Sequence, residues 1–144
     1  MSRILHAHVP LSTSPNYTAG DVVGGIIQVP SVLPVLSSIG LTESGGLSPG
    51  LTLLFFRTRP SGGVYTDNVP LTWGPEDPER WVGTVTVDPA NWRTVAGKST
   101  ATILDIGAVV GETNETLFLL VVCTQRYSPT VQSRLHMCLG FKPT

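Results

Sequence analysis

The sequence predicts an all-β protein, a two-sheet antiparallel sandwich of the jelly-roll kind. Three observations support this fold class. Short apolar runs are separated by turn-forming residues along the whole chain, and 15 glycines and 12 prolines are spread over its 144 residues. Several runs alternate between apolar and polar residues with the period of two that is typical of a strand. An immunoglobulin-like sandwich is the nearest alternative.

The stretch from Leu51 to Arg59 is the one around which the other predicted strands are arranged. Pro49 and Gly50 precede it, and the segment from Pro60 to Gly63 follows it. An apolar run between two turn-forming segments predicts a strand that is buried over much of its length. Leu117 to Thr124 is a second long apolar run and predicts another central strand.

The N-terminal region predicts two further strands. Arg3 to Val9 alternates between two faces, and residues 1–16 are expected to form an extended N-terminal arm and first strand, which precedes a single sandwich domain over 17–144. Val22 to Val29 predicts the second strand, where two adjacent glycines indicate a bulge or the close approach of another backbone. The remaining predicted strands are Val35–Leu41, Trp81–Val87, Trp92–Val95, one or two strands within Ser99–Val110, and Arg134–Lys142.

Composition and motifs exclude several classes of function. The formal net charge is −1 and there is no run of lysine or arginine, so we expect no nucleic-acid partner. Val22 to Leu41 is uncharged and long enough for a membrane helix, but its glycines and prolines favour a strand followed by an apolar loop, so we expect no membrane partner. No nucleophile motif or phosphate-binding loop is present, and we expect neither an enzyme nor a cofactor.

Histidines and cysteines are few. His6 and His8 are two residues apart on a predicted strand and could face one metal ion, but a site needs a third and a fourth ligand. His136 is the only other histidine, and we expect strand residues rather than a metal site. Cys123 and Cys138 are expected to be small core residues; a disulfide between neighbouring strands is the alternative.

Tryptophans and acidic residues offer weaker signals. Trp73, Trp81 and Trp92 are candidates either for stacking on sugars or for a place in the core or a subunit interface. The acidic residues between Glu76 and Glu79 lack the spacing of a calcium loop, so we expect a solvated loop there.

The apolar loop Val32-Leu33-Pro34-Val35-Leu36 is the most informative surface feature. So much apolar surface is unusual in a loop exposed to water. We therefore take Val32, Leu33, Pro34, Val35 and Leu36 as candidate partner-binding residues, together with Ile4 and Leu5 on the first strand. Packing of the loop onto its own core is the alternative.

Four segments together resemble a group of small virion proteins of tailed bacteriophages. They are Tyr17-Thr-Ala-Gly-Asp-Val-Val-Gly-Gly, Gly46-Leu-Ser-Pro-Gly-Leu-Thr-Leu-Leu-Phe-Phe, Asp67-Asn and Trp81-Val-Gly-Thr-Val. The resemblance covers most of the chain from Tyr17 onward, and the three tryptophans and the apolar loop depart from the pattern.

The resemblance implies a capsid decoration or cement protein, a β-sandwich that binds the major capsid protein on the outer surface of the virion. It implies a homo-oligomer, and we expect a homotrimer rather than a homodimer. The Pro/Ser/Thr-rich arm at the N-terminus would reach a neighbouring subunit. The alternatives are a carbohydrate-binding module of a head or tail appendage, and a virion connector or tail component.

Overall fold

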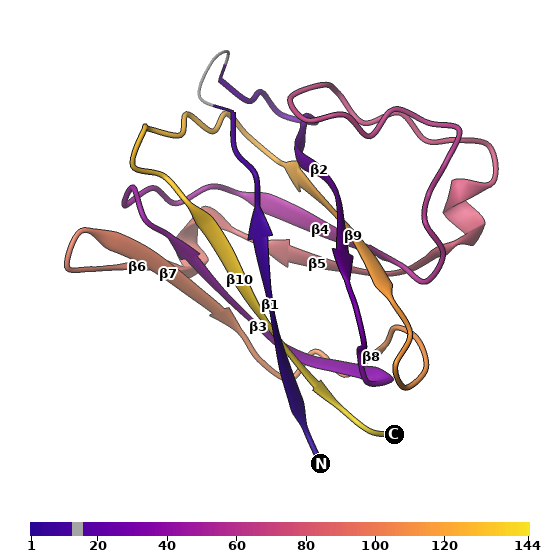
Figure 1. Ribbon diagram of the computed structural model, residues 1–144. Coiled ribbons are helices and arrows are strands. Elements are labelled where there is room, and N and C mark those ends of the chain that lie inside the picture. The colour runs from indigo at the N-terminus through magenta and orange to yellow at the C-terminus, as the bar shows by residue number, and fades with distance from the viewer. Residues whose placement is uncertain (13–15) are drawn as a thin grey trace.

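The computed structural model describes residues 1–12 and 16–144, and within these ranges the chain forms ten strands and two short 3-10 helices (Figure 1). The strands are β1 (Arg3–Val9), β2 (Val22–Val29), β3 (Val35–Glu43), β4 (Leu51–Phe56), β5 (Trp81–Val87), β6 (Trp92–Val95), β7 (Lys98–Ile103), β8 (Ala108–Val109), β9 (Leu117–Cys123) and β10 (Leu135–Lys142). The helices are η1 (Asp77–Glu79) and η2 (Pro89–Asn91). In the described ranges, no helix has the length and apolar character that crossing a membrane requires.

The strands form two antiparallel sheets, which confirms the predicted sandwich. Sheet 1 has the order β1-β10-β3-β7-β6, with β8 paired to β3, and sheet 2 has the order β2-β9-β4-β5. The chain crosses between the sheets after most strands, and its first and last strands lie side by side. This is jelly-roll connectivity. In an immunoglobulin-like sandwich the first two strands pair in one sheet, whereas β1 and β2 here lie in different sheets.

The predicted central strands, β4 and β9, are neighbours in the middle of sheet 2 and are mostly buried. Their inward-facing side chains join those of sheet 1 in the main core. β4 ends at Phe56 rather than at Arg59, and the side chain of the next residue, Arg57, turns toward the segment after β8. There it forms ion pairs with Glu112 at 3.0 Å and with Glu115 at 2.6 Å.

The long loop 57–80, which leaves β4 and returns to β5 (Figure 1), covers part of the outer face of sheet 2, whereas the outward-facing side chains of β5 stay exposed. Tyr65 and Leu71 of this loop pack against a second apolar cluster, whose buried members include Leu54 and Phe56. The loop therefore forms a partial third layer over β2, β4 and β9. This is why β4 is apolar at consecutive positions instead of alternating.

The glycine pair in β2 forms the predicted bulge. The β2–β9 register shifts between Val23 and Ile27, and Gly24 has a φ of 86°. A Cβ atom at Gly24 would lie 2.8 Å from Val9 Cγ1 and 2.9 Å from the carbonyl oxygen of Pro10. Both predicted features, the bulge and the close approach, are thus present at one residue.

The N-terminal segment is a strand of sheet 1. β1 pairs with β10 from Arg3 opposite Phe141 to Val9 opposite Leu135. Residues 13–15 of the predicted arm lie outside the described residues. Residues 3–9 are paired within their own sheet, and contact of the N-terminal segment with a neighbouring subunit stays a prediction.

The two cysteines lie on different sheets and are free thiols. Cys123 is buried in β9, as expected for a core residue. The core prediction is wrong for Cys138, which is half-buried on the outer face of sheet 1. The disulfide alternative is excluded by the same placement.

Candidate functional site

The loop from Val32 to Leu36 is buried, so the hypothesis of an exposed contact loop is wrong and the alternative, packing of the loop onto its own core, is confirmed. All five side chains are buried, and most of them belong to the main core. The segment after β8 covers the loop: Val32 N donates to the Glu115 carbonyl at 3.0 Å, and Val110 N donates to the Pro34 carbonyl at 2.9 Å. These side chains already pack within their own chain, which leaves them no surface to offer a partner.

The other two predicted partner-binding residues lie on opposite faces of β1. Ile4 is 66% exposed on the outer face of sheet 1. Leu5 faces inward, where it is half-buried and packs against the main core. A single exposed isoleucine is ordinary for a protein surface, so contact through Ile4 stays a prediction.

Two tryptophans, Trp73 and Trp81, form the candidate contact site. Their exposed fractions are 41% and 45%, whereas Trp92 is 5% exposed and its Nε1 donates to the Pro49 carbonyl at 2.8 Å. Both exposed tryptophans adjoin Phe56. The ring centroid of Trp73 lies 5.8 Å from that of Phe56, and Trp81 is paired with Phe56 in the β4–β5 register. We call Trp73 and Trp81 the tryptophan surface.

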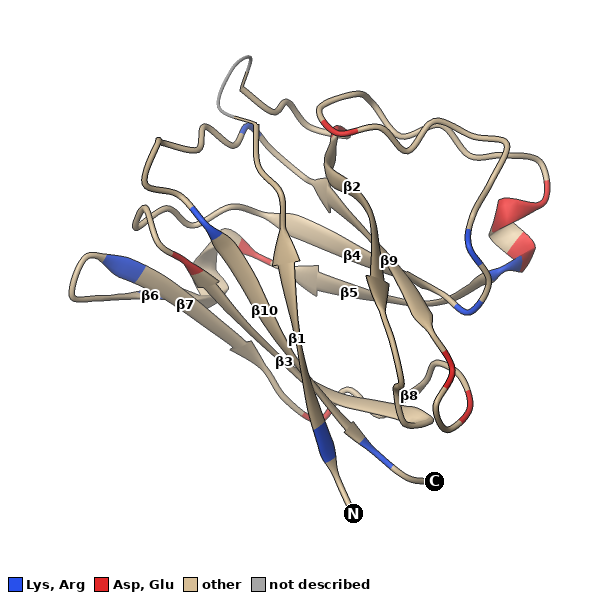
Figure 2. Cartoon of the chain, viewed as in Figure 1, with Lys and Arg blue, Asp and Glu red and all other residues tan. Residues whose placement is uncertain are grey.

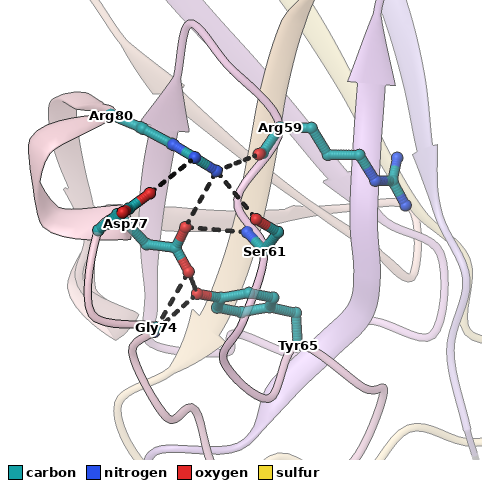
Figure 3. A network of polar contacts seen from close by, with 7 residues as sticks. Arg59, Ser61, Tyr65, Gly74, Asp77 and Arg80 are labelled. Carbon is teal, nitrogen blue, oxygen red and sulfur yellow. Dashed lines mark hydrogen bonds and ion pairs between the residues drawn. The ribbon is translucent and has the colours of Figure 1, made fainter.

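A buried carboxylate, Asp77, holds the loop that carries Trp73 (Figure 3). Asp77 is fully buried and accepts hydrogen bonds from Ser61 N at 2.8 Å, from Gly74 N at 3.2 Å and from the Tyr65 hydroxyl. Arg80 Nη1 lies 3.6 Å from its Oδ1. The prediction of a solvated acidic loop is therefore wrong for Asp77. Burying a charge is unfavourable unless it is paired and hydrogen-bonded, and here it is both.

Arg80 extends the same network to the start of the loop (Figure 3). Its Nη1 donates to the Arg59 carbonyl at 3.2 Å and to Ser61 Oγ at 2.9 Å. At the other exposed indole, Trp81 Nε1 donates to Thr84 Oγ1 at 2.9 Å. Both ends of loop 57–80 are thus tied together, and the tryptophan surface is held in a fixed arrangement.

The turn from Tyr17 to Asp21 makes its contacts within its own chain. Thr18 N donates to Asp21 Oδ2 at 2.9 Å, and Gly20 N donates to the Cys123 carbonyl at 2.8 Å. The ring of Tyr17 is stacked on that of Tyr127, with centroids 5.9 Å apart. This motif, one of those that carry the resemblance to phage virion proteins, therefore sets the entry into β2.

A cluster of His6, His8, His136 and Cys138, which local sequence patterns do not predict, lies on the outer face of sheet 1. His6 is paired with Cys138 and His8 with His136 in the β1–β10 register. The alternation placed two of these side chains on one face of each strand, but only the pairing of the first strand with the last brings them together. His6, His136 and Cys138 each offer an atom that could hold a metal ion, with all three atoms within 4.8 Å of one another.

The histidine ring at the centre of this cluster, that of His136, has a lowered pKa, which favours its neutral form. Partial burial lowers the pKa of His136, and the neighbouring His8 and His6 lower it further. Figure 2 shows that lysine, arginine, aspartate and glutamate lie mainly in loops and near strand ends, and that the middle of the β1–β10 pair carries none of them.

Comparisons with known proteins give distant likenesses only. No protein-family model and no curated protein matches the chain. Among solved structures, it is similar to CorA, a surface-associated copper-binding protein of Methylomicrobium album BG8, with 8% identity, a TM-score of 0.39, and 99% of this chain and 93% of that one covered.

Two other solved structures show a likeness of the same order. The carbohydrate-binding module TmCBM61, solved with β-1,4-galactotriose, has 10% identity and a TM-score of 0.30 over 88% of this chain and 68% of that one. A protein from the structure of tomato aspermy virus has 9% identity and a TM-score of 0.35 over 97% and 75%. At these TM-scores the similarities do not indicate a function for the chain, and none of them shows the family to which it belongs.

Proposed function

We propose that this chain is a non-enzymatic structural protein of a bacteriophage virion, a decoration protein that binds the outside of the capsid. The observation that carries the proposal is the tryptophan surface. Tryptophan is enriched in protein–protein interfaces and at their energetic hot spots. Trp73 is exposed on a loop fixed by Asp77 and Arg80, and Trp81 is exposed at the start of β5. Little conformational entropy is therefore lost when a partner binds.

The proposed partner is the major capsid protein, and the chain acts as a homotrimer. One further exposed apolar residue, Val64, is bridged through its backbone to Thr72, the neighbour of Trp73 in sequence, and is 38% exposed. Only 13% of all residues are charged, which favours a chain whose surface is partly covered by other subunits. In this arrangement the tryptophan surface, and not Val32–Leu36, meets the capsid.

The proposed mechanism is mechanical. A protein that spans the seam between capsomers and binds only the assembled shell stabilises that shell by mass action. At a free concentration 100-fold above Kd this amounts to about 2.7 kcal/mol for each bound site. No chemical step is required of the chain.

The direct test is binding of the purified chain to assembled heads and to free capsid subunits of the encoding phage, with its mass in solution measured by light scattering. The proposal predicts saturable binding to heads, none to free subunits, and the mass of a trimer. A monomeric chain that binds neither assembled heads nor free capsid subunits would contradict the proposal. A ring-shaped oligomer would instead favour a connector or tail component.

A second function, carbohydrate binding by a module of a head or tail appendage, is favoured by the same two exposed indoles. Flat aromatic side chains can stack on sugar rings, and Trp92, which is buried, takes no part. This function predicts a change in tryptophan fluorescence when β-linked galacto- or gluco-oligosaccharides are added. The decoration function predicts none.

A further inference from the structure

The cluster on the outer face of sheet 1 is made by the two strands at the ends of the chain. β1 and β10 run side by side, with both termini at the same end of the sandwich (Figure 1). His6 and His8 come from β1, and His136 and Cys138 come from β10. Gly40 is the residue of β3 paired with Cys138, so no side chain of β3 lies directly opposite the thiol. The four groups are therefore held on the face of a sheet, where His6 and His8 are exposed and His136 and Cys138 are half-buried.

The ligand atoms of three residues form a compact triangle. His6 Nδ1 lies 2.9 Å from His136 Nε2, and Cys138 Sγ lies 3.3 Å from His6 Nδ1 and 3.7 Å from His136 Nε2. Tetrahedral zinc, with bonds of about 2.0–2.1 Å to nitrogen and about 2.3 Å to sulfur, sets neighbouring nitrogens about 3.3 Å apart and nitrogen and sulfur about 3.6 Å apart. The triangle thus matches one face of a zinc tetrahedron to within a few tenths of an ångström.

His8 is placed to orient one of these ligands. Its Nδ1 lies 3.3 Å from His136 Nδ1, the ring nitrogen of His136 that faces away from the triangle. If His136 carries its proton on Nδ1, that N–H can donate a hydrogen bond to His8 Nδ1. The Nε2 atom of His136 then keeps a free lone pair that points at His6 and Cys138. Metal-binding histidines are commonly fixed in this way by a partner on the second ring nitrogen.

We propose that His6, His136 and Cys138 form a binding site for one thiophilic transition-metal ion of the zinc class, with His8 as a positioning residue. One thiolate and two imidazoles are ligands that zinc accepts and that magnesium or calcium would not select. The fourth coordination position faces solvent and takes a water molecule. The site lies away from the tryptophan surface, on the other sheet, and does not depend on the proposed virion function.

The test is a titration of the full chain with Co2+, a coloured substitute for Zn2+, under reducing conditions. The site predicts one Co2+ per chain, a sulfur-to-cobalt charge-transfer absorption and visible bands of tetrahedral intensity, all removed by one equivalent of Zn2+. C138S should lose the charge-transfer absorption, and H6Q should weaken Zn2+ binding at least about tenfold. The matched control is C123S, in which the other, buried cysteine is changed; it should keep the full spectrum.

The positioning role of His8 is tested by a separate variant. H8A should weaken Zn2+ binding about 10- to 100-fold, as expected for the loss of an outer partner, while the charge-transfer intensity at saturation stays unchanged because Cys138 still binds. Circular dichroism establishes that each variant is folded. The proposal is overturned if the wild-type chain gives no charge-transfer absorption, if C138S gives the wild-type spectrum, or if one metal ion is bound per two chains.

Discussion

Tyr17 Oη donates a hydrogen bond to Asp67 Oδ1 at 2.7 Å, which ties the segment before β2 to the loop that covers sheet 2. The amide of Gly24, in the β2 bulge, donates to the same oxygen at 2.7 Å. Two of the short motifs that resemble phage virion proteins, Tyr17-x-x-Gly-Asp and Asp67-Asn, therefore meet at one carboxylate. Their common role is to hold loop 57–80 in place.

Removing the hydrogen bond between Tyr17 and Asp67 should destabilise the fold. In Y17F the half-buried carboxylate of Asp67 loses a donor that comes from the fully buried Tyr17, and the expected loss is about 1–3 kcal/mol in the free energy of unfolding, measured with urea. D67N should cost a similar amount, and the double variant less than the sum because both changes remove one interaction. A Y17F chain as stable as the wild type would show that the contact contributes nothing.

Stability should fall in alkaline solution. Burial, together with the negative charge of Asp67, raises the pKa of Tyr17 from 10.0 to about 12. Burial and Glu43 likewise raise the pKa of Tyr127. A raised pKa in the folded state contributes stability that is fully present below the unfolded value of 10.0 and is lost as pH rises through about 12. The free energy of unfolding should therefore decline over this window, and less steeply in Y17F.

The Asp77 carboxylate should be essential to loop 57–80. D77A leaves Arg80 without its buried partner and removes the acceptor of three donors, so we expect a loss of about 3–5 kcal/mol in unfolding free energy. Limited proteolysis should then cut within the loop. The matched control is E79Q, which changes a neighbouring exposed carboxylate and should stay within about 0.5 kcal/mol of the wild type. Equal effects of the two changes would contradict the anchoring role of Asp77.

Gly24 should not tolerate a side chain. G24A places a methyl group against Val9 and Pro10 at a φ of 86°, and we expect a loss of about 1–3 kcal/mol in thermal or urea unfolding. G83A is the control, because a Cβ atom there meets nothing within 4 Å. If G83A destabilised the fold as much as G24A, the close approach at the bulge would not be the cause.

Local patterns in the sequence were sufficient to predict most strands. The alternation in β1 and β5, and the apolar runs of β4 and β9, depend only on neighbouring residues and on which face is buried. The bounds of β2 and the bulge at its glycine pair were predicted for the same reason.

The wrong predictions concern surfaces that are covered by distant segments. Val32–Leu36 looked exposed because its cover, the segment after β8, lies far along the chain. Asp77 looked solvated because its main donors, Ser61 and Tyr65, are separated from it by a long polar stretch. The cluster around Cys138 depends on the pairing of the first strand with the last, which no local pattern encodes.

The central claim, that the tryptophan surface binds the capsid, is tested most directly by the occupancy of assembled heads with the variant W73A/W81A. The matched control is V131A, which shortens a side chain that is 82% exposed elsewhere on the chain. We predict that the double variant remains folded but binds heads at least about 30-fold more weakly, as expected when hot-spot side chains worth about 2 kcal/mol or more are lost. V131A should bind like the wild type. Wild-type occupancy by the folded double variant would contradict the claim.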